Sequence, residues 1–435
     1  MNDMERSDDE MTPRSPKGRS WRKGLLIGGA VAVLVLLLAA VVYWKVTGVT
    51  SLEQGMQQLA SALQPKENDV YRKKSYSVSD RKARNSTEQV IATAADAELT
   101  NGLLQAFYWM NVYDFLENYG YYGVYYGLDY TQPLDEQSCS ESEGSWQHYF
   151  LDRALKNWHQ YQALAKLAEE EGIEMTEDLQ KDLDDLRASM TETVLDAGYP
   201  SLDALIQADM GAGCTYEDYH RYMEIYYRGY SYLEQKMNAV KLTDQVLQEY
   251  FEAHAKEFED QGITRDSGNV ADVRHILIAV EGGTVDDEGE VTYSDEEWEA
   301  CRQEAQEVLN SWLEEGATEE NFAQLAYLLS EDTGSNNNGG LYESVDADSG
   351  FVPEFIDWYM DDSRKVGDYD LVRTEYGYHV MYFCGREPKW KDASEKALIA
   401  EKNQELTDQA VEQYPAEFDF GKIALGVVDF SQKQK

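Results

Sequence analysis

The sequence is poor in cysteine, proline and positive charge, and each shortage excludes a class of protein. Four cysteines and eight prolines in 435 residues exclude a disulfide-dense secreted module and a proline-rich stalk. The 38 Lys and Arg residues stand against 82 Asp and Glu residues, which gives a formal net charge of −44. Such a chain repels nucleic-acid phosphates, so we expect no nucleic-acid partner. The apolar fraction of 43% still suffices for folded cores, and the length predicts two or three domains.

Generic motifs of hydrolysis, nucleotide binding and metal binding are missing as well. The sequence contains no GxSxG, HExxH, Walker A or complete GxGxxG motif. The acidic stretches at 286–290 and 346–348 lack the ligand and glycine pattern of an EF-hand loop, so we expect neither a metal nor a cofactor. The cysteines have no CxxC spacing, which makes buried free thiols the default and leaves a Cys301–Cys384 bridge open. They are Cys139, Cys214, Cys301 and Cys384.

The first 50 residues have the pattern of a membrane anchor. Residues 24–44 are 21 consecutive uncharged residues, which would span about 31 Å as a helix and therefore predict a transmembrane segment. A cleaved signal would have a shorter apolar region and a small-residue cleavage site, whereas Tyr43, Trp44 and Lys45 end this run as an interfacial anchor. Five basic residues lie within the ten positions before the run, and only Lys45 follows it closely. By the positive-inside rule, residues 1–23 are expected in the cytoplasm and the chain after about residue 46 outside it. The preceding basic residues are Arg14, Lys17, Arg19, Arg22 and Lys23.

Hydrophobic periodicity predicts a largely helical region after the anchor. Residues 45–85 are interpreted as a short juxtamembrane helix followed by a polar linker. Residues 86–268 begin with a short strand-like piece and then show helical spacing almost throughout, starting at residue 95. One stretch, YGYYGVYYGLDY at 119–130, is too rich in Gly and Tyr for a regular helix. It predicts an aromatic loop, either packed on the core or in contact with a client protein.

The periodicity changes at residue 273 from that of a helix to that of a strand. Short strand and helix patterns then alternate through residues 269–387. In residues 388–435 helical spacing returns at 394–413, and a strand-like alternation follows at 418–430. Helices therefore flank a compact α+β unit on both sides. We predict an α+β protein in which one mostly helical domain is built from both ends of the exported part and the unit at 269–387 is inserted into it.

Four spaced segments inside the inserted unit carry the functional signal. They are VRHILI at 273–278, FAQLAYLLSEDTGSNNNGGL at 322–341, GFVPEF at 350–355 and TEYGYHVMYF at 374–383. Together and in this order they resemble the parvulin family of peptidyl-prolyl cis/trans isomerases. The flanking helices and the anchor add a resemblance to the exported parvulin foldases of bacteria, the PrsA/SurA-like proteins. The implied fold is a small antiparallel sheet with surrounding helices, inserted into a helical chaperone domain.

The resemblance implies a polar network as the catalytic group. His275 in the first strand and His379 near the end match the paired histidines of parvulins. Asp332 stands in the loop where parvulins have Cys or Asp, and Thr374 matches the hydroxyl that joins the histidines. The histidine pair can either stiffen the site or take part in the chemistry. The sequence leaves both alternatives open.

The resemblance also implies an apolar shelf that holds the proline ring. Phe351 and Phe355 match two of its residues. The third is the Leu of a Gly-Gly-Asp-Leu-Gly turn in the family, but this chain reads Gly-Gly-Leu-Tyr-Glu, so either Leu341 or Tyr342 takes that place. Some parvulins bind phosphoserine-proline through basic residues after the first strand. The corresponding loop at 281–297 is acidic and contains no Lys or Arg, which predicts no preference for phosphate.

The resulting expectation is a membrane-anchored, extracytoplasmic isomerase and chaperone. Its partners would be unfolded or partly folded exported polypeptides with X-Pro bonds, and a homodimer is compatible with the resemblance. The alternatives are a holdase that uses the parvulin fold only to bind chains, and an assembly factor for one partner. The four polar residues favour the enzyme, and the altered turn at Leu341 and Tyr342 favours the holdase.

Overall fold

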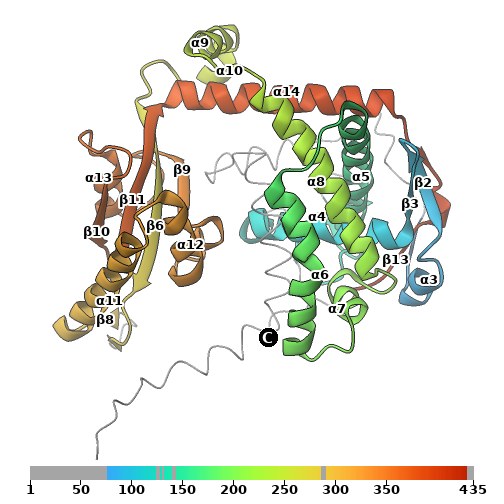
Figure 1. Cartoon of the computed structure of the whole chain (residues 1–435), viewed down its shortest axis with the longest axis horizontal. Coiled ribbons are helices and arrows are strands. Elements are labelled where there is room, and N and C mark those ends of the chain that lie inside the picture. The colour runs from blue at the N-terminus through green and yellow to red at the C-terminus, as the bar shows by residue number, and fades with distance from the viewer. Residues whose placement is uncertain (1–75, 124–127, 130–131, 140–143, 286–290, 429–435) are drawn as a thin grey trace, which may run out of the picture.

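The computed structural model describes two units connected by one long helix. The described residues are 76–123, 128–129, 132–139, 144–285 and 291–428. Helix α14 (Lys389–Gln413) leaves the smaller unit and runs along the top of Figure 1 to the larger one. The predicted membrane span at 24–44 and the helix expected after it lie outside the described ranges. Within those ranges, no helix is both long enough and apolar enough to cross a membrane.

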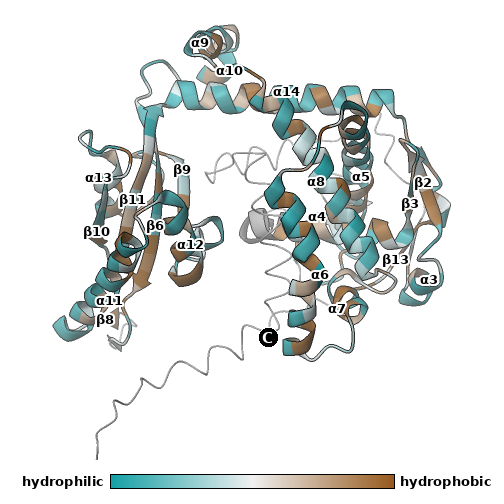
Figure 2. Ribbon diagram, viewed as in Figure 1, coloured by the Kyte–Doolittle hydropathy of each residue, from teal (hydrophilic) through white to brown (hydrophobic). Residues whose placement is uncertain are grey.

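The smaller unit is built on a four-stranded antiparallel sheet with the order β10-β11-β6-β9. Side chains alternate between the two faces of the sheet, so the core divides into two clusters. On one face Ile276 and Val380 pack with helices α11 and α12, and on the other Val273 and Met381 pack with α13. Figure 2 shows the apolar colouring of β6 and the hydrophilic colouring of much of α11. The elements are β6 (Asn269–Ala279), α11 (Asp295–Glu314), α12 (Glu319–Leu329), β9 (Leu341–Val345), α13 (Pro353–Met360), β10 (Tyr369–Arg373) and β11 (Gly377–Pro388), with a small hairpin of β7 (Thr284–Val285) and β8 (Val291–Thr292) and the 3-10 turn η2 (Asn336–Asn338).

The larger unit is a group of helices around one aromatic core. Buried rings such as Phe107, Trp146, Trp158 and Tyr219 come from helices α4, α5 and α8. Helices α9 and α10 are separate from this core, because Phe251 and its neighbours pack against the first turns of α14 instead. The helices are α4 (Asn101–Gly123), α5 (Trp146–Glu171), α6 (Glu177–Ala197), α7 (Leu202–Met210), α8 (Tyr216–Asn238), α9 (Asp244–Ala253) and α10 (Ala255–Asp260), with a two-stranded ladder of β4 (Ser138–Cys139) and β5 (Gly144–Ser145).

Strands from the two ends of the described chain pair inside the larger unit. Strand β1 (Ser77–Val78) lies parallel to β13 (Ala424–Leu425). Strand β12 (Glu417–Phe418) adds to the hairpin of β2 (Val90–Ala94) and β3 (Ala97–Thr100), and the 3-10 turn η3 (Phe420–Lys422) follows it. The first and last residues of the smaller unit lie side by side. Asn269 pairs with Pro388, and the Lys389 N–H donates to the Gly268 carbonyl at 3.0 Å.

Three local predictions are wrong. The predicted linker through residue 85 is structured at its end, because β1 pairs with the distant β13 and helix α3 (Asp80–Asn85) follows it. The loop predicted at 119–130 begins later, because α4 continues through Gly123. Extending an existing helix costs less free energy than starting one, and this outweighs the low helix propensity of Gly and Tyr. The helix expected from residue 95 begins at Asn101, because Ala95 and Asp96 have positive φ and turn β2 into β3.

The open question about the cysteines has a simple answer. Cys301 and Cys384 remain thiols in the described structure. Cys301 is buried, and its Sγ donates a hydrogen bond to the Ile278 carbonyl at 3.1 Å. This thiol therefore contributes to the packing of α11 against the sheet.

Candidate active site

The two histidines meet on the sheet face that α13 covers. His275 in β6 pairs with Met381 of β11, and His379 lies two residues before Met381 on the same face. The two imidazoles are therefore diagonal neighbours, with 2.9 Å between their Nδ1 atoms. Both side chains are buried, with exposed fractions of 3% and 5%. The register of β6 against β11 thus brings together two residues that are 104 positions apart.

Asp332 determines the direction of the hydrogen bonds in this network. An ionised carboxylate only accepts, so the His275 Nε2–H donates to Asp332 Oδ2 at 2.8 Å. In the tautomer that carries its proton on Nε2, the Nδ1 atom of His275 accepts from the Nδ1–H of His379. The remaining Nε2 atom of His379 accepts from the Thr374 hydroxyl at 2.8 Å. Both nitrogens of both rings are therefore engaged within the protein, which holds the rings in one orientation and one tautomer.

The protonation states follow from burial and from these partners. Burial would raise the pKa of Asp332, but the hydrogen bonds that its carboxylate accepts from His275, Ser335 and the Gly334 N–H outweigh burial and hold the pKa well below its ordinary value. Burial and the neighbouring His275 lower the pKa of His379 to about 3. The carboxylate is thus ionised and His379 is neutral at neutral pH. The directed chain of donors described above requires both of these states.

The Asp332 carboxylate accepts from two further hydroxyls, of which the sequence singled out Tyr342 only for the proline shelf and Ser335 not at all. The Ser335 hydroxyl donates to Oδ2 at 2.5 Å, and the Tyr342 hydroxyl donates to the same atom at 2.9 Å. Ser335 is 1% exposed and also lies 3.0 Å from His275 Nε2. The spacing of Asp332 and Ser335 at i and i+3 in a loop is a typical side-chain turn pattern. That spacing is the signal from which Ser335 could have been predicted.

The loop that carries Asp332 is fixed to the exposed edge of β6. The Ser330 hydroxyl accepts from the Leu277 N–H at 3.1 Å, and the Glu331 N–H donates to the Leu277 carbonyl at 2.9 Å. At the other end of the loop the Gly340 carbonyl accepts from the His275 N–H at 2.8 Å. Gly340 has a φ of +73°, and a Cβ there would lie 2.1 Å from the His275 carbonyl oxygen. Only glycine allows this approach.

Three aromatic rings lie beside the histidines. The Phe355 ring stands edge-on to both imidazoles, with centroid distances of 5.0 Å to His275 and 5.3 Å to His379. Phe351 lies 5.1 Å from Phe355 and 4.7 Å from the Tyr342 ring. Phe355 is buried, whereas Phe351 and Tyr342 are partly exposed. An apolar surface of rings therefore opens to solvent directly above the polar network.

Strand register decides between Leu341 and Tyr342. Tyr342 pairs with Val273 of β6 and so lies on the face of the histidines, where it contacts Phe351. Leu341 pairs with Arg274, which places it on the opposite face, and it is 7% exposed. The structure thus brings seven of the eight predicted site residues together and puts Leu341 behind the sheet.

Comparison with known proteins agrees with this geometry. The family model of the PPIC-type PPIase domain matches residues 260–386. This part of the chain is a PPIC-type peptidyl-prolyl isomerase domain. The resemblance to parvulins is thereby confirmed, and the PPIC-type domain contains every residue of the polar network and of the aromatic surface. Domains of this type catalyse rotation about X-Pro bonds.

Curated relatives match less than half of the chain. The foldase protein PrsA of Clostridium botulinum strain Okra is 27% identical over 184 residues, and that of strain Langeland is 26% identical over the same length. Each match covers 40% of this chain and 45% of the relative, so the chain spans less than half the length of the curated relatives it matches.

Solved structures of PrsA proteins are similar to 60% of this chain. The PrsA structure from Bacillus subtilis has 17% identity, covers 81% of that chain and has a TM-score of 0.29. PrsA from Streptococcus pneumoniae has 19% identity, the same coverage and a TM-score of 0.20. Scores this low carry no argument about how the two units are arranged. The assignment therefore rests on the PPIC-type domain and its site.

Proposed function

We propose that this chain is a membrane-anchored foldase that isomerises X-Pro bonds in exported polypeptides and holds these clients on its helical unit. The observation that carries the proposal is the closed network from Thr374 to Asp332 beneath the exposed rings of Tyr342 and Phe351. This arrangement presents an apolar surface for a proline ring next to a fixed anion. The PPIC-type domain and the similarity to PrsA foldases support it.

The chemistry needs no nucleophile, because isomerisation makes and breaks no bond. Resonance stiffens the X-Pro amide, and uncatalysed rotation takes tens to hundreds of seconds. A rate increase of about 10⁴-fold requires about 5.5 kcal/mol of preferential stabilisation of the twisted amide. The twisted amide is less dipolar than the planar one, so an apolar surrounding favours it. Phe351, Phe355 and Tyr342 provide that surrounding and grip the ring while the preceding carbonyl rotates.

We assign different roles to the polar residues. His275 and His379 are positioning residues, because all four ring nitrogens already bond within the protein. Their function is to hold Asp332 and the sheet face in one geometry. Asp332 and the Tyr342 hydroxyl are at the solvent-facing end of the network, where they can orient the substrate amide. Of the two alternatives for the histidine pair, we therefore propose that it stiffens the site and does not transfer protons.

An isomerase assay on a short Ala-Pro peptide tests the proposal. The full chain should accelerate exchange measured by NMR, and Asp332→Ala should lower the rate at least 10-fold while thermal melting shows a folded protein. The exposed Asp348 is a matched acidic loop residue of the same domain, and Asp348→Ala should leave the rate unchanged. If the wild-type chain is inactive but still prevents aggregation of an unfolded protein, the holdase alternative replaces the enzyme.

The membrane anchor and the extracytoplasmic location are a separate part of the proposal. They rest on the uncharged run at 24–44 and on the basic residues before it. The chain should stay in the membrane fraction after alkaline extraction, and protease outside intact cells should digest it beyond residue 50. Complete protection of the PPIC-type domain in that experiment would place it on the cytoplasmic side and refute the orientation.

A further inference from the structure

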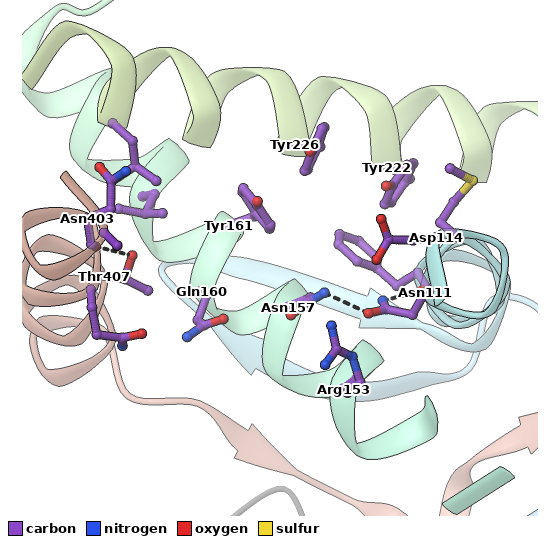
Figure 3. A pocket seen from close by; sticks show the side chains of 16 residues that line it. Asn111, Asp114, Arg153, Asn157, Gln160, Tyr161, Tyr222, Tyr226, Asn403 and Thr407 are labelled. Atoms are coloured by element: carbon purple, nitrogen blue, oxygen red, sulfur yellow. Dashed lines mark hydrogen bonds between the residues drawn. The ribbon is translucent and has the colours of Figure 1, made fainter. Parts of the chain in front are cut away.

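The larger unit contains a cavity of about 340 Å³, which lies outside the isomerase domain. Its walls come from α4, α5, α8 and the second half of α14 (Figure 3). A volume of this size falls within the range of ligand sites in proteins. Helices from both ends of the exported chain thus meet around one space, and the isomerisation chemistry uses none of its residues.

One wall of the cavity is a rigid stack of aromatic rings. Tyr222 and Tyr226 of α8 are stacked at 5.9 Å with an interplanar angle of 11°. Tyr161 of α5 lies 4.6 Å from Tyr226, and Phe107 of α4 lies 4.7 Å edge-on to Tyr222. Burial raises the pKa of Tyr161 to about 12, so its hydroxyl stays protonated. Such a wall accepts a flat apolar group by stacking and edge contacts.

The opposite wall is made of side-chain amides that are held in place. The Asn157 Nδ2 donates to Asn111 Oδ1 at 2.8 Å, and the Asn111 Nδ2 donates to the Phe107 carbonyl at 2.7 Å. Asn403 of α14 also lines the cavity (Figure 3). Its Oδ1 atom is buried and accepts no hydrogen bond from any residue that the structure describes. A buried acceptor without a donor is unfavourable, and a ligand N–H would satisfy it.

The charges at the cavity exclude several classes of ligand. Asp114 and Arg153 bring one acidic and one basic group to the lining. Burial raises the pKa of Asp114 to about 6 although Arg153 opposes the shift, so the lining carries little net charge. The chain as a whole is strongly acidic and repels anions. An acyl chain would fill the space but could not donate to Asn403. A neutral group that combines a flat apolar part with an N–H donor fits both walls.

We propose that this cavity binds an aromatic side chain of an unfolded client, with a backbone N–H of the same segment donating to Asn403 Oδ1. The proposal rests on the role of the chain as a foldase. It adds a second client site, which recognises an aromatic residue whether or not the segment contains proline. Because α14 follows directly after β11, the strand that carries His379, the client site and the isomerase site are linked by one continuous stretch of chain.

Peptide binding to the full chain in detergent micelles tests the proposal. The probe is a fluorescein-labelled Gly-Ser-Asn peptide of 11 residues with one central phenylalanine and no proline, and its partner peptide has alanine at the centre. Fluorescence anisotropy, corrected for empty micelles, should show at least 10-fold tighter binding of the phenylalanine peptide. N-methylation of the central residue and its neighbour should weaken binding several-fold. Equal affinity for the phenylalanine and alanine peptides would overturn the proposal.

Matched variants on α14 locate the site. Ala400 lines the cavity and is exposed, so Ala400→Trp should plug the cavity without disturbing the core and weaken binding at least 10-fold. Gln409 is also exposed and lies two and a half turns further along the same helix, on the side opposite Ala400, so Gln409→Trp should bind like the wild type. Asn403→Leu should weaken binding and should remove most of the N-methylation effect. Wild-type affinity in the folded Ala400→Trp variant would overturn the proposal.

A photo-crosslinking probe gives a second, independent readout. With benzoylphenylalanine at the centre of the peptide, crosslinks should map to α5, α8 or α14 around the cavity; crosslinks confined to the PPIC-type domain would contradict the site. All three variants should isomerise a short Ala-Pro peptide at the wild-type rate. Loss of isomerisation in the wild type would refute the proposed enzyme, whereas loss of selective peptide binding would refute only this cavity as a client site.

Discussion

The two units of this protein use buried polar groups in opposite ways. In the PPIC-type domain His275, His379 and Asp332 form a directed network in which each ring nitrogen has a partner. In the helical unit large aromatic residues fill the core, and several polar atoms on them, such as Tyr219 OH and Trp158 Nε1, have no hydrogen-bond partner among the described residues. Directional bonds hold a geometry, whereas apolar burial is non-directional. The comparison indicates that the isomerase site depends on directional hydrogen bonds, whereas the aromatic core of the helical unit depends mainly on apolar burial.

Excision of the PPIC-type domain has the largest expected effect and tests whether the units are separable. Asn269 and Pro388 pair side by side, so residues 269–387 can be replaced by a short glycine linker with little loop-closure cost. All isomerase activity should disappear. The helical unit should still unfold in one cooperative transition, because β1 and β12 tie its two chain ends together.

Circular dichroism and thermal melting of the excised chain measure this outcome, and suppression of client aggregation measures the function that remains. Full-length protein with Asp332→Ala is the control for loss of activity without loss of the domain. An unfolded excised chain would show that the helical unit needs the PPIC-type domain in order to fold. The stabilities of the two units could then not be compared separately.

Acid should destabilise the isomerase domain before the helical unit. The folded-state pKa of His379 is lowered to about 3 from an ordinary value of about 6.5, so the unfolded chain takes up the proton first. The contribution of this group to stability is complete above pH 6.5 and is lost as the pH falls toward 3. Between pH 7 and 4.5 the free energy of unfolding of the domain should drop by about 2–3 kcal/mol. The lowered pKa of Asp332 adds a further loss only below about pH 4.

Urea unfolding followed by protease protection of residues 269–387 measures this pH dependence. His379→Asn keeps an N–H donor for His275 but removes the titrating ring, so its unfolding free energy should change much less over the same interval. A wild-type profile that is as flat as that of the variant would mean that His379 is not held neutral by burial.

Removing one hydroxyl from the network should have a moderate effect. Tyr342→Phe keeps the ring against Phe351 but takes away one of the donors to Asp332. The domain should lose about 1 kcal/mol of stability, and kcat/KM on an Ala-Pro peptide should fall about 2- to 5-fold. Tyr327→Phe changes an exposed tyrosine of α12 and should alter neither value. Equal behaviour of the two variants would show that the Tyr342 hydroxyl does not orient the carboxylate.

A phosphate on the residue before proline should have the smallest effect on the isomerisation rate. It should slow the reaction, if it changes the rate at all, whereas parvulins that bind phosphoserine-proline prefer the phosphorylated peptide. The acidic segment at 281–297 and the ionised Asp332 both repel a phosphoserine. Isomerisation of a phosphoserine-proline peptide should be as fast as, or a few-fold slower than, that of the Ala-Pro peptide. Salt should reduce any difference, because it screens exposed charges. A clear preference for the phosphorylated peptide would mean that a basic site has been overlooked.

The isomerase domain was far more predictable than the helical unit. The resemblance of its motif segments to parvulins indicated His275, His379, Asp332 and Thr374, and the register of β6 against β11 places the two histidines on one face. The third member of the shelf was not predictable, because the choice of Tyr342 over Leu341 depends on the pairing of β9 with β6 and a shift of one residue reverses the two faces. In the helical unit, residues 77–85 were taken for a linker because their partners, Ala424 and Leu425, lie more than 300 positions away.

By itself the amino-acid sequence determined the apolar run at 24–44, the acidic balance and the order of the four motif segments. These are local properties: hydrophobicity, charge and residue spacing belong to the chain whatever its fold. Only the tertiary structure decided that Asp332 accepts from Ser335 and Tyr342 as well as from His275, and that Asn403 lines the same cavity as Tyr226. These contacts join residues from different elements, and their geometry depends on how strands register and helices pack, which no short stretch of sequence encodes.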